Sequence, residues 1–204
     1  MTNDIDKYPV SRETLQDLKT YEASLHEWQN KFNLVSKNSL NDSWGRHFLD
    51  SMQLYSLVPE GAKTLIDLGS GAGFPGMVLA IMAKGRTPSL KICLVESISK
   101  KTLYLKHVSE ITNTNVEVIN ERIEKLKPRT VDVVTSRALA SLSELLGLAK
   151  SFCAPKTKCI FPKGKSYQSE IDEVKKLWSF DCDIIPNQES QEGVILIITN
   201  LRRK

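Results

Sequence analysis

The chain has 204 residues, of which 41% are hydrophobic and 25% are charged, and its formal net charge is +4 at pH 7. This composition suits one domain with a full core, and it excludes a membrane span and, on the polar start from Met1 to Asp6, a signal peptide. The four cysteines show no CxxC spacing, so we expect reduced thiols in a cytoplasmic protein, with neither a disulfide framework nor a metal site.

Helices are expected before the first strand. Apolar residues from Leu15 to Phe32 recur at steps of three and four, which predicts one buried helix face. A second helical stretch covers roughly residues 43–58 and ends before Pro59. We expect residues 1–60 to form an N-terminal helical extension that packs on a single compact unit at residues 61–204.

Strands and helices alternate beyond residue 61. Strands are expected at residues 64–68, 91–95, 116–119, 131–135 and 157–161, with helices near 76–83, 99–111, 142–151 and 166–177. This alternation predicts a parallel sheet with right-handed crossovers. Residues 181–185 and 194–200 flank a short polar loop and should form an antiparallel hairpin. We therefore expect an α/β fold, with a mostly parallel, seven-stranded, Rossmann-like sheet whose last strand is antiparallel, as in class I S-adenosylmethionine-dependent methyltransferases.

A glycine-rich turn follows the first expected strand. From Leu65 to Gly76 the chain reads Leu-Ile-Asp-Leu-Gly-Ser-Gly-Ala-Gly-Phe-Pro-Gly. Glycine allows a sharp bend that still approaches a ligand closely, and the helix that follows offers unpaired N–H groups. A strand, a turn and a helix of this kind form the nucleotide site of an open α/β sheet.

Two nucleotide ligands fit this turn. Gly71, Gly73 and Gly76 satisfy the dinucleotide fingerprint G-x-G-x-x-G, and Glu96 lies twenty residues beyond Gly76, where an acid that binds ribose belongs. Gly69, Gly71 and Gly73 also complete the pattern Asp-x-Gly-x-Gly-x-Gly, the first motif of methyltransferases that use S-adenosylmethionine.

Two residues favour the methyl donor. Asp67 places a carboxylate before the first glycine, which disfavours a pyrophosphate and suits a ligand with an ammonium and a sulfonium group. Pro75 removes one N–H from the turn and so weakens it as a phosphate cradle.

Motifs along most of the chain resemble those of one family. They stand at residues 28–36, 46–51, 67–76, 95–97, 100–101, 122–124, 136–138 and 163–165. From about His26 onward the chain resembles the bacterial small-subunit ribosomal RNA 7-methylguanosine methyltransferases, also called glucose-inhibited division protein B. Two of these motifs are the most diagnostic of the family: the Phe-Pro-Gly that ends the glycine turn and the Ser-Arg-Ala around Arg137. Gln29 stands where the family usually has asparagine, which puts a local hydrogen bond in question.

The resemblance implies transfer of a methyl group from S-adenosylmethionine to ring nitrogen 7 of one guanine, position 527 in the usual numbering of 16S rRNA. That nitrogen has a free lone pair, so no general base is required, and the sequence offers no evident one. The nitrogen lies on an edge that side chains do not reach in A-form RNA, so the base should be unpaired or displaced from its stack. The expected partner is 16S rRNA or the small ribosomal subunit, and the enzyme is expected to be a monomer.

The resemblance also implies site residues. Glu96 should accept both ribose hydroxyls, Ile123 and Glu124 should lie near the adenine edge, and Phe74 should line the methionine and ribose side. The expected cofactor-binding residues are Asp67, Gly69, Gly71, Gly73, Phe74, Glu96, Ile123, Glu124 and Arg137. Arg137 and His47 are expected to act in catalysis by positioning.

Basic residues near the strand ends are expected to meet RNA phosphates at the carboxyl edge of the sheet. The expected RNA-binding residues are Arg46, Lys100, Lys101, Arg122, Lys163 and Lys165. Lys175 and Lys176 are interpreted as a solvated helix face, and residues 202–204 as a frayed tail.

Other functions remain open from the sequence. The dinucleotide fingerprint allows an NAD(P)-dependent oxidoreductase, and the same fold allows a non-catalytic RNA-binding or ribosome-assembly factor. A methyltransferase of different specificity is also compatible, because fold does not fix function.

Overall fold

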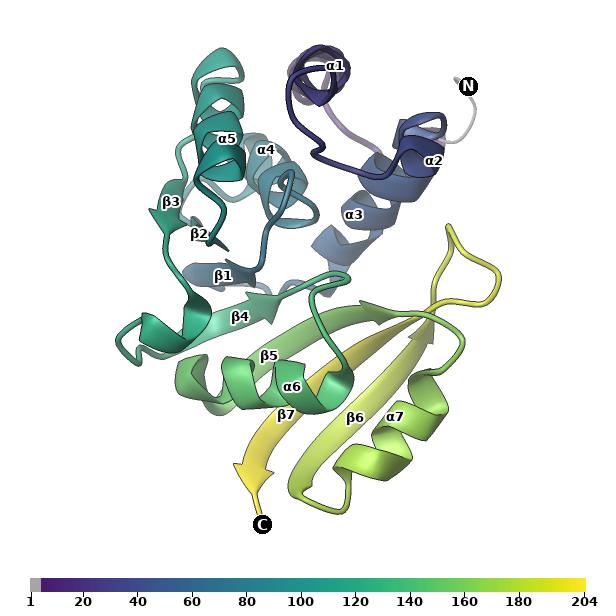
Figure 1. The fold of residues 1–204 in the computed structure, drawn as a ribbon, viewed down its shortest axis with the longest axis vertical. Coiled ribbons are helices and arrows are strands. Elements are labelled where there is room, and N and C mark those ends of the chain that lie inside the picture. Colours follow the sequence, from purple (N-terminus) through teal and green to yellow (C-terminus); the bar gives the residue numbers. More distant parts are fainter. Residues whose placement is uncertain (1–4) are drawn as a thin grey trace.

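The computed structural model describes residues 5–204, so residues 1–4 of the expected extension and of the polar start lie outside it. Its centre is a seven-stranded sheet in the order β3-β2-β1-β4-β5-β7-β6 (Figure 1). The strands are β1 (Thr64–Leu68), β2 (Lys91–Glu96), β3 (Glu117–Asn120), β4 (Val131–Thr135), β5 (Cys153–Lys163), β6 (Trp178–Pro186) and β7 (Val194–Arg203).

The strand directions confirm the expected mixed sheet. β1 pairs in parallel with β2 and β4, and the parallel pairing extends to β3 on one side and β5 on the other. β7 lies between β5 and β6 and runs antiparallel to both. The expected hairpin is therefore present.

The C-terminal segment is more ordered than the sequence analysis expected. β7 continues to Arg203, and Arg202 and Arg203 pair with Ser179 and Trp178 of β6. The interpretation of residues 202–204 as a frayed tail is wrong, because a whole strand of backbone pairing holds most of this segment.

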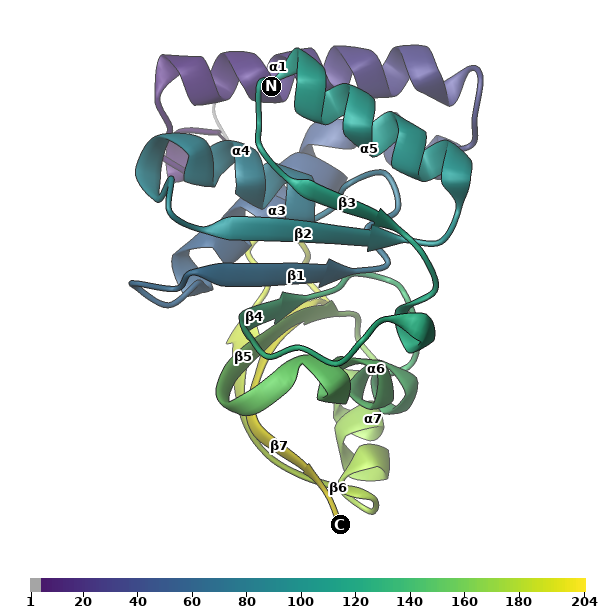
Figure 2. The same cartoon turned by 90° about the vertical axis from the view of Figure 1, so that its left-hand side faces the viewer.

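Helices cover both faces of the sheet. Figures 1 and 2 show α1, α4 and α5 with the other N-terminal helices on one face, and α6 and α7 on the other. The α-helices are α1 (Arg12–Gln29), α2 (Lys37–Leu40), α3 (Asp50–Met52), α4 (Gly76–Arg86), α5 (Ser99–Ile111), α6 (Leu142–Ala149) and α7 (Tyr167–Val174).

The expected helix at residues 43–58 is not continuous. It consists of a π-helix (Trp44–Leu49), α3, and a 3-10 helix (Gln53–Leu57). The Asp50 N–H donates to the carbonyl of Gly45, five residues back, which is the hydrogen bond of a π-helix. This widened turn carries Arg46 and His47, two of the expected site residues.

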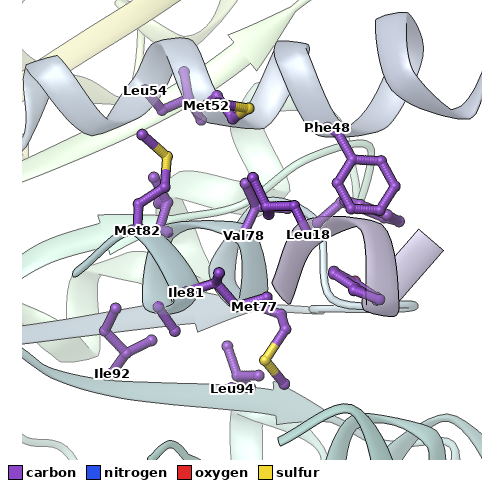
Figure 3. Close-up of a cluster of buried hydrophobic side chains, with 14 of the residues drawn as sticks. Leu18, Phe48, Met52, Leu54, Met77, Val78, Ile81, Met82, Ile92 and Leu94 are labelled. Atoms are coloured by element: carbon purple, nitrogen blue, oxygen red, sulfur yellow. The ribbon is translucent and has the colours of Figure 1, made fainter. Parts of the chain in front are cut away.

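The N-terminal helices share one core with the sheet. Leu18 of α1 and Phe48 of the π-helix lie among Met77, Val78 and Ile81 of α4 (Figure 3). Each of these side chains is fully buried, and such burial contributes about 1.5–3 kcal/mol per large apolar side chain. No helix within residues 5–204 is long and apolar enough to cross a membrane.

Gln29 closes the turn after α1. Its Oε1 accepts from the N–H groups of Leu34 and Val35, both at 3.0 Å, and its Nε2 donates to the Val35 carbonyl at 2.9 Å. The local hydrogen bonding that the departure from asparagine put in question is thus made by glutamine.

Candidate active site

A cavity of about 1150 Å³ opens at the carboxyl ends of β1, β2 and β4, where open α/β sheets bind ligands. It is large for a small-molecule site, which leaves room for an acceptor beside a cofactor. Most expected site residues line it, namely Arg46, His47, Gly69, Gly71, Phe74, Glu96, Lys101, Arg122, Ile123, Glu124, Arg137 and Lys163. Asp67, Gly73, Lys100 and Lys165 do not line it.

The glycine turn lies directly against the core. Gly73 has a φ of +105°, and a Cβ at this position would overlap the Tyr21 hydroxyl and lie 2.9 Å from the Met77 Cβ. The same hydroxyl donates to the Ala72 carbonyl. By contrast, a Cβ on Gly71 would meet nothing nearer than the Gly69 carbonyl at 3.9 Å, so this part of the turn faces open space.

Asp67 stabilises the glycine turn from its buried side. It is fully buried, and its carboxylate accepts from the Thr135 hydroxyl at 2.7 Å and from the Gly76 N–H at 3.3 Å. Burial raises the pKa of Asp67 to about 6, against hydrogen bonds from Thr135, Ser70 and Gly76 that lower it. The carboxylate therefore binds the Gly76 N–H at the start of α4, which leaves that N–H unavailable to a phosphate. Asp67 was expected to face the ligand, but it does not line the cavity.

Glu96 projects from the end of β2 into the cavity. One carboxylate oxygen accepts from the Gly71 N–H at 2.9 Å and the other from the Ile98 N–H at 2.8 Å. Each oxygen retains a lone pair, so the fixed carboxylate suits a pair of adjacent hydroxyls. Beyond it, Ile123 and Glu124 line the wall at the 3-10 helix Ile123–Lys125. These groups fit the ribose and adenine of S-adenosylmethionine.

Arg137 follows β4 and is held by the N-terminal helices. Its Nη1 donates to the Arg46 carbonyl at 2.6 Å and to Asp50 Oδ2 at 3.0 Å, and its Nη2 lies 2.7 Å from His47 Nδ1. The guanidinium also lies over the Phe74 ring, 5.2 Å from its centroid.

His47 is neutral in this arrangement. Burial, and then the charges of Arg137 and Arg46, lower the pKa of His47 to about 4. Because Arg137 occupies Nδ1 as a donor, the imidazole proton lies on Nε2. The ring stacks on Phe74 at 4.7 Å between centroids. An aromatic and cationic wall results, and it contains no group ready to accept a proton at neutral pH.

The loop between β6 and β7 forms a further part of the cavity wall, next to Asp50. Asn187 Nδ2 donates to Asp50 Oδ1 at 2.8 Å, and Gln53 Nε2 donates to Asn187 Oδ1 at 2.9 Å. Tyr8 donates from its hydroxyl to Glu189 at 2.7 Å. Asn187 and Glu189 were not predicted as site residues, because no local pattern links this loop to helices more than 130 residues earlier.

The expected RNA-binding residues fall into two groups. Lys101, Arg122, Arg46 and Lys163 line the cavity, although Lys163 already forms a 2.7 Å ion pair with Glu170. Lys100 lies over the Phe32 ring, and Lys165 lies 4.0 Å from Glu192, both outside the cavity lining. Within residues 5–204, no cluster of three His, Cys, Asp or Glu side chains is arranged to hold a metal ion.

Comparison with known proteins identifies relatives of the whole chain. The model of the family described as GidB, rRNA small subunit methyltransferase G, matches residues 14–191. The chain is 43% identical over 199 residues to the ribosomal RNA small subunit methyltransferase G of Paramagnetospirillum magneticum, and the match covers 98% of this chain and 95% of that protein.

Solved structures share the fold. The ribosomal protein L11 methylase of Lactobacillus delbrueckii has a TM-score of 0.60 at 12% identity, covering 74% of this chain and 77% of that chain. An S-adenosylmethionine-dependent methyltransferase of Aquifex aeolicus has a TM-score of 0.58 at 16% identity, covering 74% and 89%. The sheet is therefore that of the class I methyltransferases.

Proposed function

The chain belongs to the rRNA small subunit methyltransferase G family, and from this premise we propose that it methylates ring nitrogen 7 of the guanine at position 527 of 16S rRNA. It is an enzyme whose methyl donor is S-adenosylmethionine, which when bound supplies a methyl group on a positively charged sulfur. The comparisons support neither an oxidoreductase nor a non-catalytic assembly factor.

One observation carries the proposal for the site. A single cavity joins Glu96 at one end to Arg137 and His47 at the other, with the glycine turn between them. Glu96 would accept the ribose hydroxyls, and the open face of Gly71 would let the backbone approach the donor. Ile123 and Glu124 would lie along the adenine.

The acceptor end would hold the target base. Arg137, His47 and Phe74 form a rigid wall there, since the arginine is fixed by three hydrogen bonds and the two rings are stacked. Nitrogen 7 of guanine needs no deprotonation, so these residues would act by orienting the base. Orientation alone contributes up to roughly 7–11 kcal/mol in the best cases.

Arg46, Lys101 and Arg122 would bind RNA phosphates around the cavity. We further propose that residues 1–60 act as a helical extension on a methyltransferase unit at residues 61–204. The chain would work as a monomer in the cytoplasm, where its rRNA substrate is found.

The test is to map the modified nucleotide. Small-subunit RNA that lacks the modification is incubated with the chain and labelled S-adenosylmethionine, and the labelled position is read. We expect label at nitrogen 7 of guanine 527 for the unaltered chain and none for Arg137→Ala. Label at another nucleotide, or binding of NADH without binding of S-adenosylmethionine in calorimetric titration, would contradict the proposal.

A further inference from the structure

A second basic surface lies at the end of the β6–β7 hairpin that is opposite the cavity. Arg202 and Arg203 stand at the end of β7, paired with Ser179 and Trp178 at the start of β6. The backbone N–H of Lys204 donates to the Leu177 carbonyl at 3.0 Å. Arg202 and Arg203 are successive residues of β7, so their side chains leave opposite faces of the sheet at its end. We call this end of the hairpin, which carries Lys175, Lys176, Arg202, Arg203 and Lys204, the distal basic surface.

The fold brings these charges together. Lys175 and Lys176 follow α7, 26 or more residues before Arg202, and the Lys204 ammonium donates to the Lys175 carbonyl at 2.6 Å. All five residues are exposed, and none forms an ion pair with another residue in the described part of the chain. Exposed cations without an ion-pair partner hold condensed or mobile counterions only, so they remain available to the phosphates of a polyanion.

The acids closest along the chain do not neutralise this surface. Asp181 accepts a hydrogen bond from Asn200 at 2.5 Å and is paired opposite Thr199, further along the hairpin. Glu173 lies on α7 before the two lysines and forms no ion pair among residues 5–204. The surface therefore presents a local excess of positive charge on a chain whose net charge is only +4.

The two ends of the hairpin are separated by the length of its strands. β6 has nine residues, which at about 3.3 Å each span about 30 Å. At one end the loop with Asn187 and Glu189 lines the cavity, and at the other lies the distal basic surface. Figure 1 shows the β6–β7 loop and the C-terminus at opposite ends of the hairpin.

We infer that the distal basic surface is a second RNA-docking site, which binds phosphates of the same rRNA about 30 Å from the target base. This inference rests on the proposed function, because it takes the rRNA substrate as the polyanion. Phosphate contacts of this kind add affinity and orientation without reading sequence. Neither Arg202 nor Arg203 lines the cavity, so donor binding should not depend on them.

The experiment compares binding of unmodified 16S rRNA at several salt concentrations for the full chain and for Arg202→Gln/Arg203→Gln. Each lost phosphate contact should reduce the slope of log affinity against log salt by about 1, so we expect a reduction of about 2. Affinity for S-adenosylmethionine should stay within about twofold of the unaltered chain.

Matched variants complete the test. Lys19→Gln/Lys106→Gln removes the same charge from exposed positions on α1 and α5, and its slope should match that of the unaltered chain. If Arg202→Gln/Arg203→Gln does not fold, Lys175→Gln/Lys176→Gln replaces it. An unchanged slope for the distal variants, or an equal loss in the control, overturns the inference. Because binding is measured, absence of methyl transfer by the unaltered chain would contradict the proposed function separately.

Discussion

The Asp50 carboxylate lies 3.0 Å from the Arg137 guanidinium, although the two residues are 87 positions apart in the chain. Both side chains are largely buried, at 14% and 17% exposed. The other Asp50 oxygen accepts from Asn187 in the β6–β7 loop. One carboxylate therefore links three parts of the cavity wall, and the orientation of Arg137 depends on all of them.

Asp50→Asn should slow methyl transfer and leave donor binding intact. The amide weakens the bond to Arg137 and loses its charge assistance. We expect kcat to fall about tenfold or more, which corresponds to about 1.4 kcal/mol, with less than a twofold change in the Kd of S-adenosylmethionine. Steady-state kinetics and calorimetry measure the two effects. Asp42→Asn, which also alters the cavity lining but does not contact Arg137, is the control, and equal loss in both variants would refute the role of Asp50.

Gly73→Ala should destabilise the fold. The added methyl group would overlap the Tyr21 hydroxyl in a backbone conformation that disfavours side chains, and we expect a loss of about 2–4 kcal/mol in the free energy of unfolding. Gly71→Ala, which meets open space, should cost only about 1–2 kcal/mol, from its positive φ. Urea denaturation measures both.

A double variant tests the cause of this loss. Tyr21→Phe removes the hydroxyl that the alanine would meet, so Tyr21→Phe/Gly73→Ala should be more stable than the sum of the single losses predicts. If the two losses in the free energy of unfolding simply add, the overlap with Tyr21 is not the cause of the destabilisation by Gly73→Ala.

Glu96→Gln should weaken donor binding. The amide nitrogen would face either the Gly71 or the Ile98 N–H, and the carboxylate that we propose as acceptor of the ribose hydroxyls is lost. We expect the Kd of S-adenosylmethionine to rise about 10- to 100-fold in calorimetric titration, or about 1.4–2.8 kcal/mol. Glu121→Gln makes the same charge change elsewhere in the cavity lining and should have a smaller effect. If both variants lose similar affinity for S-adenosylmethionine, the effect comes from the net charge of the cavity and not from the position of Glu96.

Asp67 should make stability depend on pH. Its pKa is about 6 in the fold and 3.8 ordinarily, so the folded chain holds a proton that the unfolded chain releases. The stabilisation is complete below about pH 4 and is lost as pH rises through 6, by on the order of 3 kcal/mol. The unfolding free energy of the unaltered chain minus that of Asp67→Asn should therefore fall from pH 4 to pH 7. A difference that stays constant with pH would contradict the raised pKa.

Protonation of His47 should not affect the pH dependence of activity near neutrality. Its pKa of about 4 keeps it neutral, and the acceptor nitrogen needs no base. We expect kcat/KM to show no limb from His47 between pH 6 and 8. An acidic limb near pH 6.5 that disappears in His47→Gln would show that the ring titrates normally.

The sequence was sufficient for much of the fold. Short apolar runs bounded by turn residues predicted β1 and β4 with their observed ends, and strand alternation predicted the parallel sheet. The glycine turn and Glu96 were found for the same reason, since their chemistry is local in sequence. The position of Asp67 was not predictable, because strand β1 is buried on both faces and alternation does not reveal which face meets α4.

Contacts between distant segments were beyond local reasoning. Nothing near Asn187 indicates that it binds Asp50, which lies 137 residues earlier in the chain. The same holds for Arg202 and Arg203, whose place in a strand depends on pairing with β6.

The insertion of β7 between β5 and β6 has a consequence for the chain during its own synthesis. The N-terminal helices and the donor side of the cleft emerge from the ribosome early, whereas the loop from Asn187 to Gly193 and the strand that anchors it follow much later. A growing chain therefore cannot complete the wall of the cavity until that strand has been made.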